Sequence, residues 1–186
     1  MKTVRVHTDG ACAGNQSAEN VGGWGAVLEY QGTTKELFGG ERNTTNNRME
    51  LTALIEGLRA LKSDSLALEI FSDSAYVINC FRQGWHLKWV ANGWVNSKKE
   101  PVENQDLWQQ LLKEVARFPQ VSYFSIKGHL DLRREAEISQ WHAKFNRNNH
   151  LQFSREAFLE IVRMNHLVDA LANRGIDAAR QQEELK

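Results

Sequence analysis

TTNNRMEL, residues Thr44 to Leu51, begins an expected helix and places a carboxylate on its apolar side. Apolar residues then recur at the three-and-four spacing of a helix with one buried face, at Leu51, Leu54, Ile55, Leu58 and Leu61. Glu50 is in phase with this face. Because a buried carboxylate is tolerated only when it is paired, hydrogen-bonded or bound to a metal ion, the chain must supply compensation for Glu50 elsewhere.

The patterns around this helix predict a mixed α/β sheet. Alternating apolar and polar residues predict three strands before it, and further helices and strands follow it. The expected strands are 2–10, 22–30, 34–42, 66–73 and 121–129, and the expected helices are 44–62, 74–82, 104–117, 132–145 and a long one from about 154. This order indicates a mixed sheet with helices packed on its faces.

The composition fits one globular domain that spans 1–186. Of the 186 residues, 41% are apolar and 25% are charged, which argues against disorder. The apolar runs are too short to cross a bilayer and the start lacks the apolar core of a secretory signal, so we expect a cytoplasmic protein without a membrane segment. Lys plus Arg and Asp plus Glu balance at 23 each, so a nucleic-acid partner would have to meet locally grouped basic residues.

Four acids are candidates for a shared site. Asp9 and Asp73 end expected strands, where α/β proteins gather ligands, and Asp169 repeats on the last helix the in-phase position of Glu50. Each has an ordinary alternative, because strand-end aspartates cap helices and boundary glutamates extend toward water. If all four converge, their mutual repulsion calls for cations among them, and oxygen-only ligands favour Mg²⁺.

Five motifs, in this order, resemble the signatures of the type 1 ribonuclease H family. They are TDGAC at 8–12, TTNNRMEL at 44–51, SDS at 72–74, KGH at 127–129 and NHLVDALAN at 165–173. The resemblance implies a ribonuclease H-like fold, a five-stranded mixed sheet with helices on both faces. It also implies hydrolysis of the RNA strand of RNA–DNA hybrids, leaving 5′-phosphate and 3′-hydroxyl ends.

The same resemblance assigns roles to the acids. Asp9, Glu50, Asp73 and Asp169 match the family's metal ligands, which would hold two Mg²⁺ ions, with Mn²⁺ as an alternative. His129 matches a histidine on a flexible loop that transfers a proton or assists product release. A loop histidine near neutral pKa is also often inert, so this role has a plain alternative.

The segment from Ser74 to Lys99 carries no acidic residue and resembles the family's basic protrusion, which contacts the DNA strand. Its expected contacts are Trp85, Lys88, Trp89, Trp94, Lys98 and Lys99. The indoles could equally pack a small subdomain. Three uncharged residues, 90–92, stand where strongly basic versions carry lysine or arginine.

Short polar groups near the acids would read the hybrid. By resemblance, Cys12, Asn15, Asn46 and Asn47 would contact its minor groove, and Thr45 and Asn104 would hold a DNA phosphate. Helix capping is the alternative for Thr45 and Asn46. The loop that holds Asn15 is longer than usual and could place it differently.

A helical insertion at about 130–164 is the largest departure from the family pattern. Its aromatic residues could pack on the last helix, or its basic residues could contact the hybrid. Other nucleases of this fold group, and a module that binds hybrids without cutting them, are rival interpretations. We expect a monomer.

The uncharged residues 90–92 predict weaker and less salt-sensitive hybrid binding than a lysine-rich protrusion would give, because each phosphate contact adds to the salt dependence. A titration of hybrid affinity against salt concentration measures this. A steep slope would contradict it.

Overall fold

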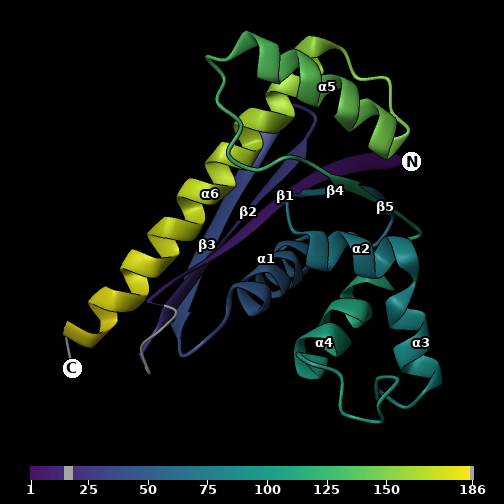
Figure 1. Cartoon of the computed structure of the whole chain (residues 1–186), viewed down its shortest axis with the longest axis vertical. Coiled ribbons are helices and arrows are strands. Elements are labelled where there is room, and N and C mark those ends of the chain that lie inside the picture. Colours follow the sequence, from purple (N-terminus) through teal and green to yellow (C-terminus); the bar gives the residue numbers. More distant parts are fainter. Residues whose placement is uncertain (15–18, 185–186) are drawn as a thin grey trace.

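The computed structural model describes residues 1–14 and 19–184, and they form a five-stranded mixed sheet with helices on both faces (Figure 1). The strand order is β3-β2-β1-β4-β5. The strands are β1 (Lys2–Ala13), β2 (Val21–Tyr30), β3 (Thr33–Arg42), β4 (Leu66–Ser72) and β5 (Gln120–Ser125). The first three pair antiparallel, and β4 and β5 add in parallel to β1. The predicted sheet is confirmed.

The helices divide between the two faces. They are α1 (Asn46–Arg59), α2 (Ala75–Gln83), α3 (Trp85–Ala91), α4 (Gln105–Val115), α5 (Glu135–Asn149) and α6 (Arg155–Glu184). Neighbouring residues of a strand face opposite sides, and on β4 Ile70 packs with α1 and α4 whereas Phe71 packs with α5 and α6. The first face therefore carries α1, α2 and α4, and the second carries α5 and α6.

Helix α6 approaches the second face almost backbone to backbone, because glycines line the contact. A Cβ added to Gly23 of β2 would lie 1.9 Å from the carbonyl oxygen of Ala172. One added to Gly40 of β3 would lie 2.1 Å from the carbonyl oxygen of Gly175. Any side chain at these positions would force the helix away from the sheet.

The predicted insertion, 130–164, contains α5 and the first turns of α6. Phe145 of α5 is 4% exposed, and its ring lies 5.3 Å from that of Phe158 on α6 and 5.5 Å from that of Phe153. This cluster also contains Phe71 of β4. The segment therefore packs on the sheet and on the start of α6, as the packing interpretation expects.

Side chains occupy the free edge of β5, which pairs only with β4. Asn149, at the end of α5, accepts a hydrogen bond from the backbone N–H of Ser125 and donates one to its carbonyl oxygen, each at 2.9 Å. Arg82 of α2 donates to the carbonyl oxygen of Tyr123 at 3.0 Å and also to the Asn149 side chain. Outward-facing backbone groups of β5 are thereby satisfied.

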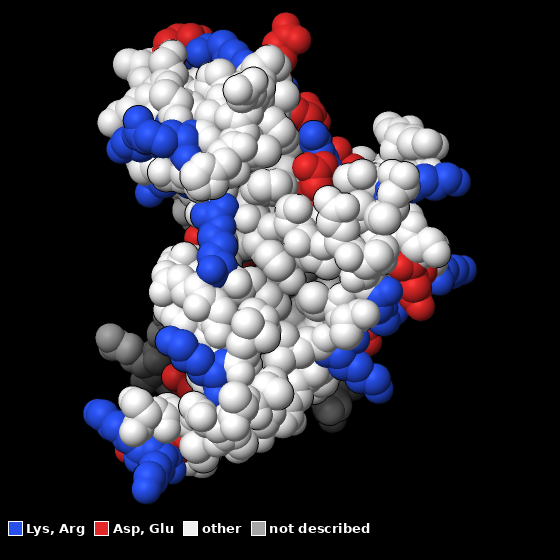
Figure 2. Space-filling view, turned by 90° about the vertical axis from the view of Figure 1, so that its right-hand side faces the viewer, with Lys and Arg blue, Asp and Glu red and all other residues white. Residues whose placement is uncertain are grey.

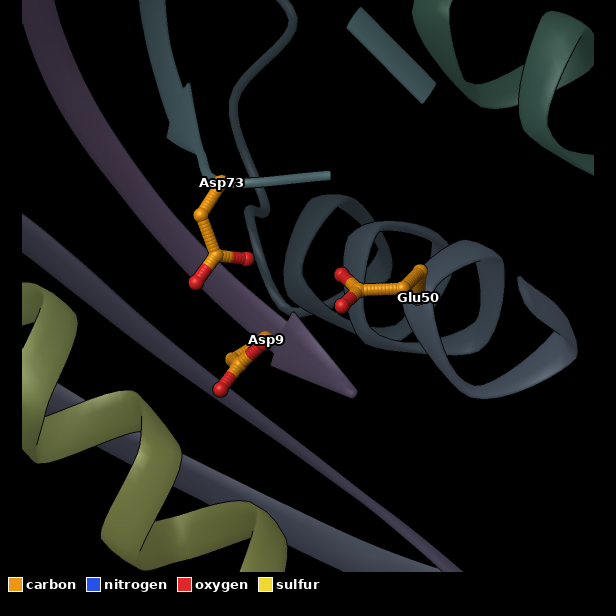
Figure 3. A group of neighbouring side chains, drawn as sticks. All are labelled: Asp9, Glu50 and Asp73. Atoms are coloured by element: carbon orange, nitrogen blue, oxygen red, sulfur yellow. The ribbon is translucent and has the colours of Figure 1, made fainter. Parts of the chain in front are cut away.

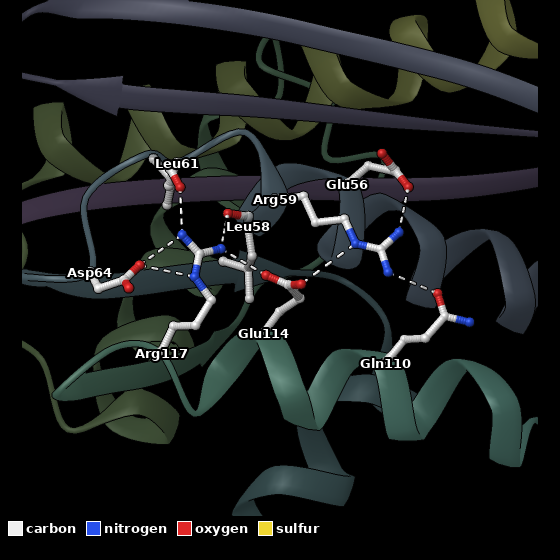
Figure 4. Close-up of polar contacts among 8 residues, drawn as sticks. All are labelled: Glu56, Leu58, Arg59, Leu61, Asp64, Gln110, Glu114 and Arg117. Carbon is white, nitrogen blue, oxygen red and sulfur yellow. Dashed lines mark hydrogen bonds and ion pairs between the residues drawn. The ribbon is translucent and has the colours of Figure 1, made fainter.

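A polar network fixes α4 to the end of α1 (Figure 4). Arg117 donates to the carbonyl oxygens of Leu58 at 3.1 Å and Leu61 at 2.6 Å, in the last turn of α1 and just after it. Its guanidinium also pairs with Asp64 and Glu114, at 2.8 and 2.7 Å. These contacts fix the C-terminal end of α1, the helix that carries Glu50.

Several predicted boundaries were wrong. Strand β1 does not end at Asp9 but continues to Ala13, because it goes on pairing with β2 after its last pair with β4, His7 with Phe71. Helix α1 begins at Asn46, since Thr45 is its N-cap. Helix α3 was not predicted as an element, although Trp85 and Trp89 are one turn apart. No described helix is long and apolar enough to cross a membrane.

Exchanging Gly23 for alanine should lower the free energy of unfolding by about 1–3 kcal/mol, because the new methyl group overlaps α6 backbone. The matched control is Gly57→Ala inside α1, where the added Cβ would meet Ala26 at an ordinary 3.5 Å. That change should raise the free energy of unfolding by about 0.5–1 kcal/mol, because alanine has a higher helix propensity than glycine. Urea unfolding of both variants measures the difference, and equal effects would contradict the close approach of α6.

Candidate active site

Three carboxylates from separate elements converge at one place. Asp9 comes from β1, Glu50 from α1 and Asp73 from the residue after β4, and one oxygen of each lies within 4.8 Å of the others (Figure 3). Asp9 and Glu50 are each 4% exposed. The buried face of α1 therefore directs Glu50 toward Asp9. This explains why a carboxylate lies on the apolar side of the helix.

Two glycines let the backbone close around these acids. A Cβ at Gly10 would lie 2.4 Å from the backbone nitrogen of Glu50, so α1 sits directly on β1 at this point. A Cβ at Gly128 would lie 2.3 Å from Oδ2 of Asp73, so the loop after β5 closes against that carboxylate. The position of Asp73 thus depends on the absence of a side chain at Gly128.

Asp169 and His129 line the same cavity as the three acids. It has a volume of about 430 Å³, and its lining also includes Cys12, Asn46 and Asn173. Asp169 stands farther out than the other acids, since only Asp9, Glu50 and Asp73 form the compact group. His129 is exposed and has a left-handed backbone with φ of 56°.

Burial and like charge make the cluster costly without a cation. Burial, followed by the charge of Asp73, raises the pKa of Asp9 to about 8, and Asp169 contributes in the same direction. Burial, followed by the charges of Asp9 and Asp73, raises the pKa of Glu50 well above its usual value.

One oxygen of the cluster is left without a partner. Oε2 of Glu50 is buried and has no hydrogen-bond partner within the described part of the chain. A buried carboxylate oxygen that no N–H or O–H meets is suited to a cation. The residues present therefore fit a divalent metal site made of oxygen ligands.

Sequence reasoning missed one polar contact to the cluster. Asn165 of α6 is 5% exposed and its Nδ2 donates to Oδ2 of Asp73 at 3.5 Å. It lies four residues before Asp169, on the same helix face, so its spacing was the available signal. Asn165 ties α6 to Asp73 and helps to orient that carboxylate.

The predicted phosphate-holding residues lie around one arginine. Thr45 Oγ1 accepts the backbone N–H of Arg48 as an N-cap, at 3.1 Å. The Arg48 guanidinium reaches Oδ1 of Asn104 at 3.3 Å and pairs with Asp106 at 2.8 Å. The capping alternative for Thr45 is therefore present in the structure, and Arg48 contacts both residues, Thr45 through its backbone and Asn104 through its guanidinium.

The remaining polar candidates are placed unequally. Cys12 and Asn46 line the cavity of the acids. Asn47 is half-buried in the first turn of α1 and is not part of that lining. Asn15 lies outside the described residues.

The tryptophans of the protrusion are half-buried. Trp85, Trp89 and Trp94 pack against the core that α1 and α4 share, and the ring of Trp89 lies 5.4 Å from that of the buried Trp108. This supports the packing alternative for the indoles. The lysines nearby, Lys88, Lys98 and Lys99, are exposed.

Comparison with known sequences gives a consistent result. A family model described as RNase H matches residues 1–177. Ribonuclease H of Thermoanaerobacter sp. (strain X514) is 56% identical over 131 residues, which cover 70% of this chain and 81% of the relative. Ribonuclease H of Symbiobacterium thermophilum is 55% identical over 132 residues, which cover 71% and 86%.

Solved structures share the fold. The crystal structure of LC9-RNase H1, described as a type 1 RNase H with the type 2 active-site motif, has a TM-score of 0.61 at 24% identity and covers 89% of this chain and 85% of its own. LC11-RNase H1 in complex with RNA/DNA hybrid has a TM-score of 0.57 at 21% identity, with coverage of 95% and 98%. Both likenesses support the predicted fold class.

The acid cluster predicts a pH-dependent stability. Because the pKa of Asp9 is raised in the folded state, its contribution is complete below the unfolded pKa of about 3.9 and is lost as pH rises toward about 8. In EDTA, Asp9→Asn should therefore raise the melting temperature by several degrees at pH 8 and by less at pH 5.

The control is Asp177→Asn, which changes an exposed carboxylate on α6. It should change the melting temperature little at either pH. Mg²⁺ should also stabilise the unsubstituted protein at pH 8, because the ion binds only the folded site. A gain for Asp9→Asn that is the same at both pH values would contradict the account.

Proposed function

The chain belongs to the ribonuclease H family, and we propose from the placement of its acids how it hydrolyses the RNA strand of an RNA–DNA hybrid. The observation that carries the proposal is the convergence of three carboxylates, two buried and one half-buried, with oxygens within 4.8 Å. Such a group is unfavourable by itself and becomes favourable around divalent cations.

Asp9, Glu50, Asp73 and Asp169 would hold two Mg²⁺ ions, since hard oxygen ligands shared with substrate phosphate suit this ion; Mn²⁺ is the alternative. When bound, the two ions would supply Lewis acidity for the attacking water and for the leaving oxygen. Gly128 and Asn165 would keep the Asp73 carboxylate in place, the first by leaving room and the second by donating a hydrogen bond. Glu50, as the most enclosed acid, would have the most fixed position.

His129 would handle the proton. Water adds to phosphorus and the P–O3′ bond breaks, so the products carry a 5′-phosphate and a 3′-hydroxyl. The leaving 3′ oxygen needs a proton, and an exposed imidazole at the rim of the cavity can deliver it. Because the same side chain is accessible to solvent, it could take up a new proton from water or assist product release.

The hybrid would lie across the cavity and the first face. Cys12 and Asn46 at the cavity, with Asn15 and Asn47 nearby in sequence, would read the minor groove and its 2′-hydroxyls. Thr45 and Asn104 would hold a DNA phosphate beside the Arg48 guanidinium. Lys88, Lys98 and Lys99 would meet the DNA backbone, with Trp85, Trp89 and Trp94 supporting them from below.

The monomeric state and the cytoplasmic location expected from the sequence are part of this proposal. A single chain supplies all four acids and the histidine, so a partner chain is not needed to complete the cavity. Light scattering in solution would test the monomer.

The activity is tested with end-labelled RNA–DNA hybrid, double-stranded RNA and double-stranded DNA, each in Mg²⁺, Mn²⁺ or EDTA. We expect metal-dependent cleavage of the hybrid RNA alone. Asp73→Asn should lower kcat by at least roughly a hundredfold, because an ionised ligand is lost. The control Asp177→Asn, an exposed acid on the helix that carries Asp169, should keep full activity.

Other outcomes separate the rivals. Cleavage of double-stranded DNA would support a different nuclease of the same fold group. Tight hybrid binding without cleavage in either metal would support a binding module. Full activity of Asp73→Asn would contradict the assigned ligand set.

A further inference from the structure

Helix α5 carries a group of side chains that the proposed function does not use. The indole of Trp141 lies under two ammonium groups, that of Lys144 at 4.4 Å from the ring centre and that of Lys127 at 5.4 Å. A small cavity of about 180 Å³ opens between α5 and the end of β5, and these three residues line it with Ser125, Ile126, Phe145 and Asn148.

The two lysines lack acidic partners. Within the described residues neither forms an ion pair, although both are held against one ring. The arginines at the start of the insertion differ, since Arg133 pairs with Asp131 at 3.0 Å and Arg134 with Glu137 at 3.1 Å. Two ammonium groups that line one cavity without an acidic partner make that cavity attractive to an anion.

Lys127 connects the small cavity to the cavity of the acids along the chain. Lys127 lines the small cavity and His129, two residues later, lines the cavity of the acids. Two residues of extended chain span at most about 7 Å. One strand of a duplex rises about 3.4 Å per nucleotide along the axis, and its neighbouring phosphates lie farther apart than this rise, so the small cavity stands about one or two nucleotides from the phosphate at the acids.

The location also selects one strand. The residues expected to hold the DNA strand lie at the N-terminal ends of α1 and α4, on α3 and in the segment between α3 and α4, on or beyond the first face of the sheet. Helix α5 packs on the second face. In Figure 2, Lys and Arg side chains follow one side of the view, over the upper part, where α5 lies, and over the lower part, where α3 lies, with a hollow between them.

We propose that Lys127, Trp141 and Lys144 form a subsite for a phosphate of the strand that is cut, about one or two nucleotides from the broken bond. This rests on the proposed function for the identity of that strand as RNA. Trp141 holds both ammonium groups at the mouth of the cavity through cation–π contacts. The insertion thus adds a substrate contact to a packing role.

The test measures hybrid binding in an Asp73→Asn background, so that cleavage does not interfere. Lys144→Glu should weaken binding by roughly three- to tenfold and reduce the salt slope by about one ion. Lys144→Arg should restore most of the affinity. The matched control is Lys35→Glu, an exposed lysine on β3 at the opposite edge of the sheet, which should change neither quantity as much.

A second measurement locates the phosphate. Single neutral methylphosphonate groups are placed along the RNA strand and then along the DNA strand. One RNA position, about one or two nucleotides from the cleavage point, should lose affinity in the parent and lose no more in Lys144→Glu. Melting curves confirm that the variants are folded.

The outcomes separate the two proposals. Equal losses for Lys144→Glu and Lys35→Glu, or a sensitive position on the DNA strand only, would overturn the subsite while leaving hydrolysis intact. Absence of RNA cleavage by the unsubstituted protein would instead overturn the proposed function, whatever the binding measurements give.

Discussion

Close contact between helices and sheet is the constraint on which the rest of the structure depends. Gly10 lets α1 touch β1, and Gly23 and Gly40 let α6 touch β2 and β3. Without those contacts, the acids on the two helices would be held at ordinary helix-to-sheet distance from Asp9. Glycine is used here because it has no side chain and leaves space for the helix backbone. The acids of the two helices and of the sheet between them can then come close to one another.

That contact brings charges together as well as backbones. The fold holds carboxylates where burial and mutual repulsion oppose their ionisation, a local cost that the large cores on both faces must offset. The unpartnered oxygen of Glu50 belongs to the same arrangement. The same acids therefore lower the stability of the metal-free protein and make the site suited to cations. Functional sites commonly show this trade-off between stability and function.

Sequence reasoning reached the acids because helical phase is visible in a chain. Glu50 and Asp169 interrupt apolar faces, and such interruptions need no partner to be noticed. Contacts between elements were less accessible. The glycines of β2 fell inside a predicted strand without any sign that a helix lies directly on them. Asp9 was placed at a strand end because the extra pairing with β2 has no local signal. Asn165 was placed on the helix face of Asp169, but its contact with Asp73 was not predicted. The tryptophans show another limit. Their spacing in the sequence did not reveal that they are half-buried, because the exposure of a side chain depends on its packing against other elements.

The end of α5 has a consequence for the behaviour of many molecules together. A parallel strand at the margin of a sheet offers a template on which another chain can add and begin aggregation. Asn149 and Arg82 fill the outward hydrogen-bonding positions of Ser125 and Tyr123 with side chains. Together, α2 and the insertion cover part of the edge of β5 and leave fewer backbone groups there for another chain to pair with.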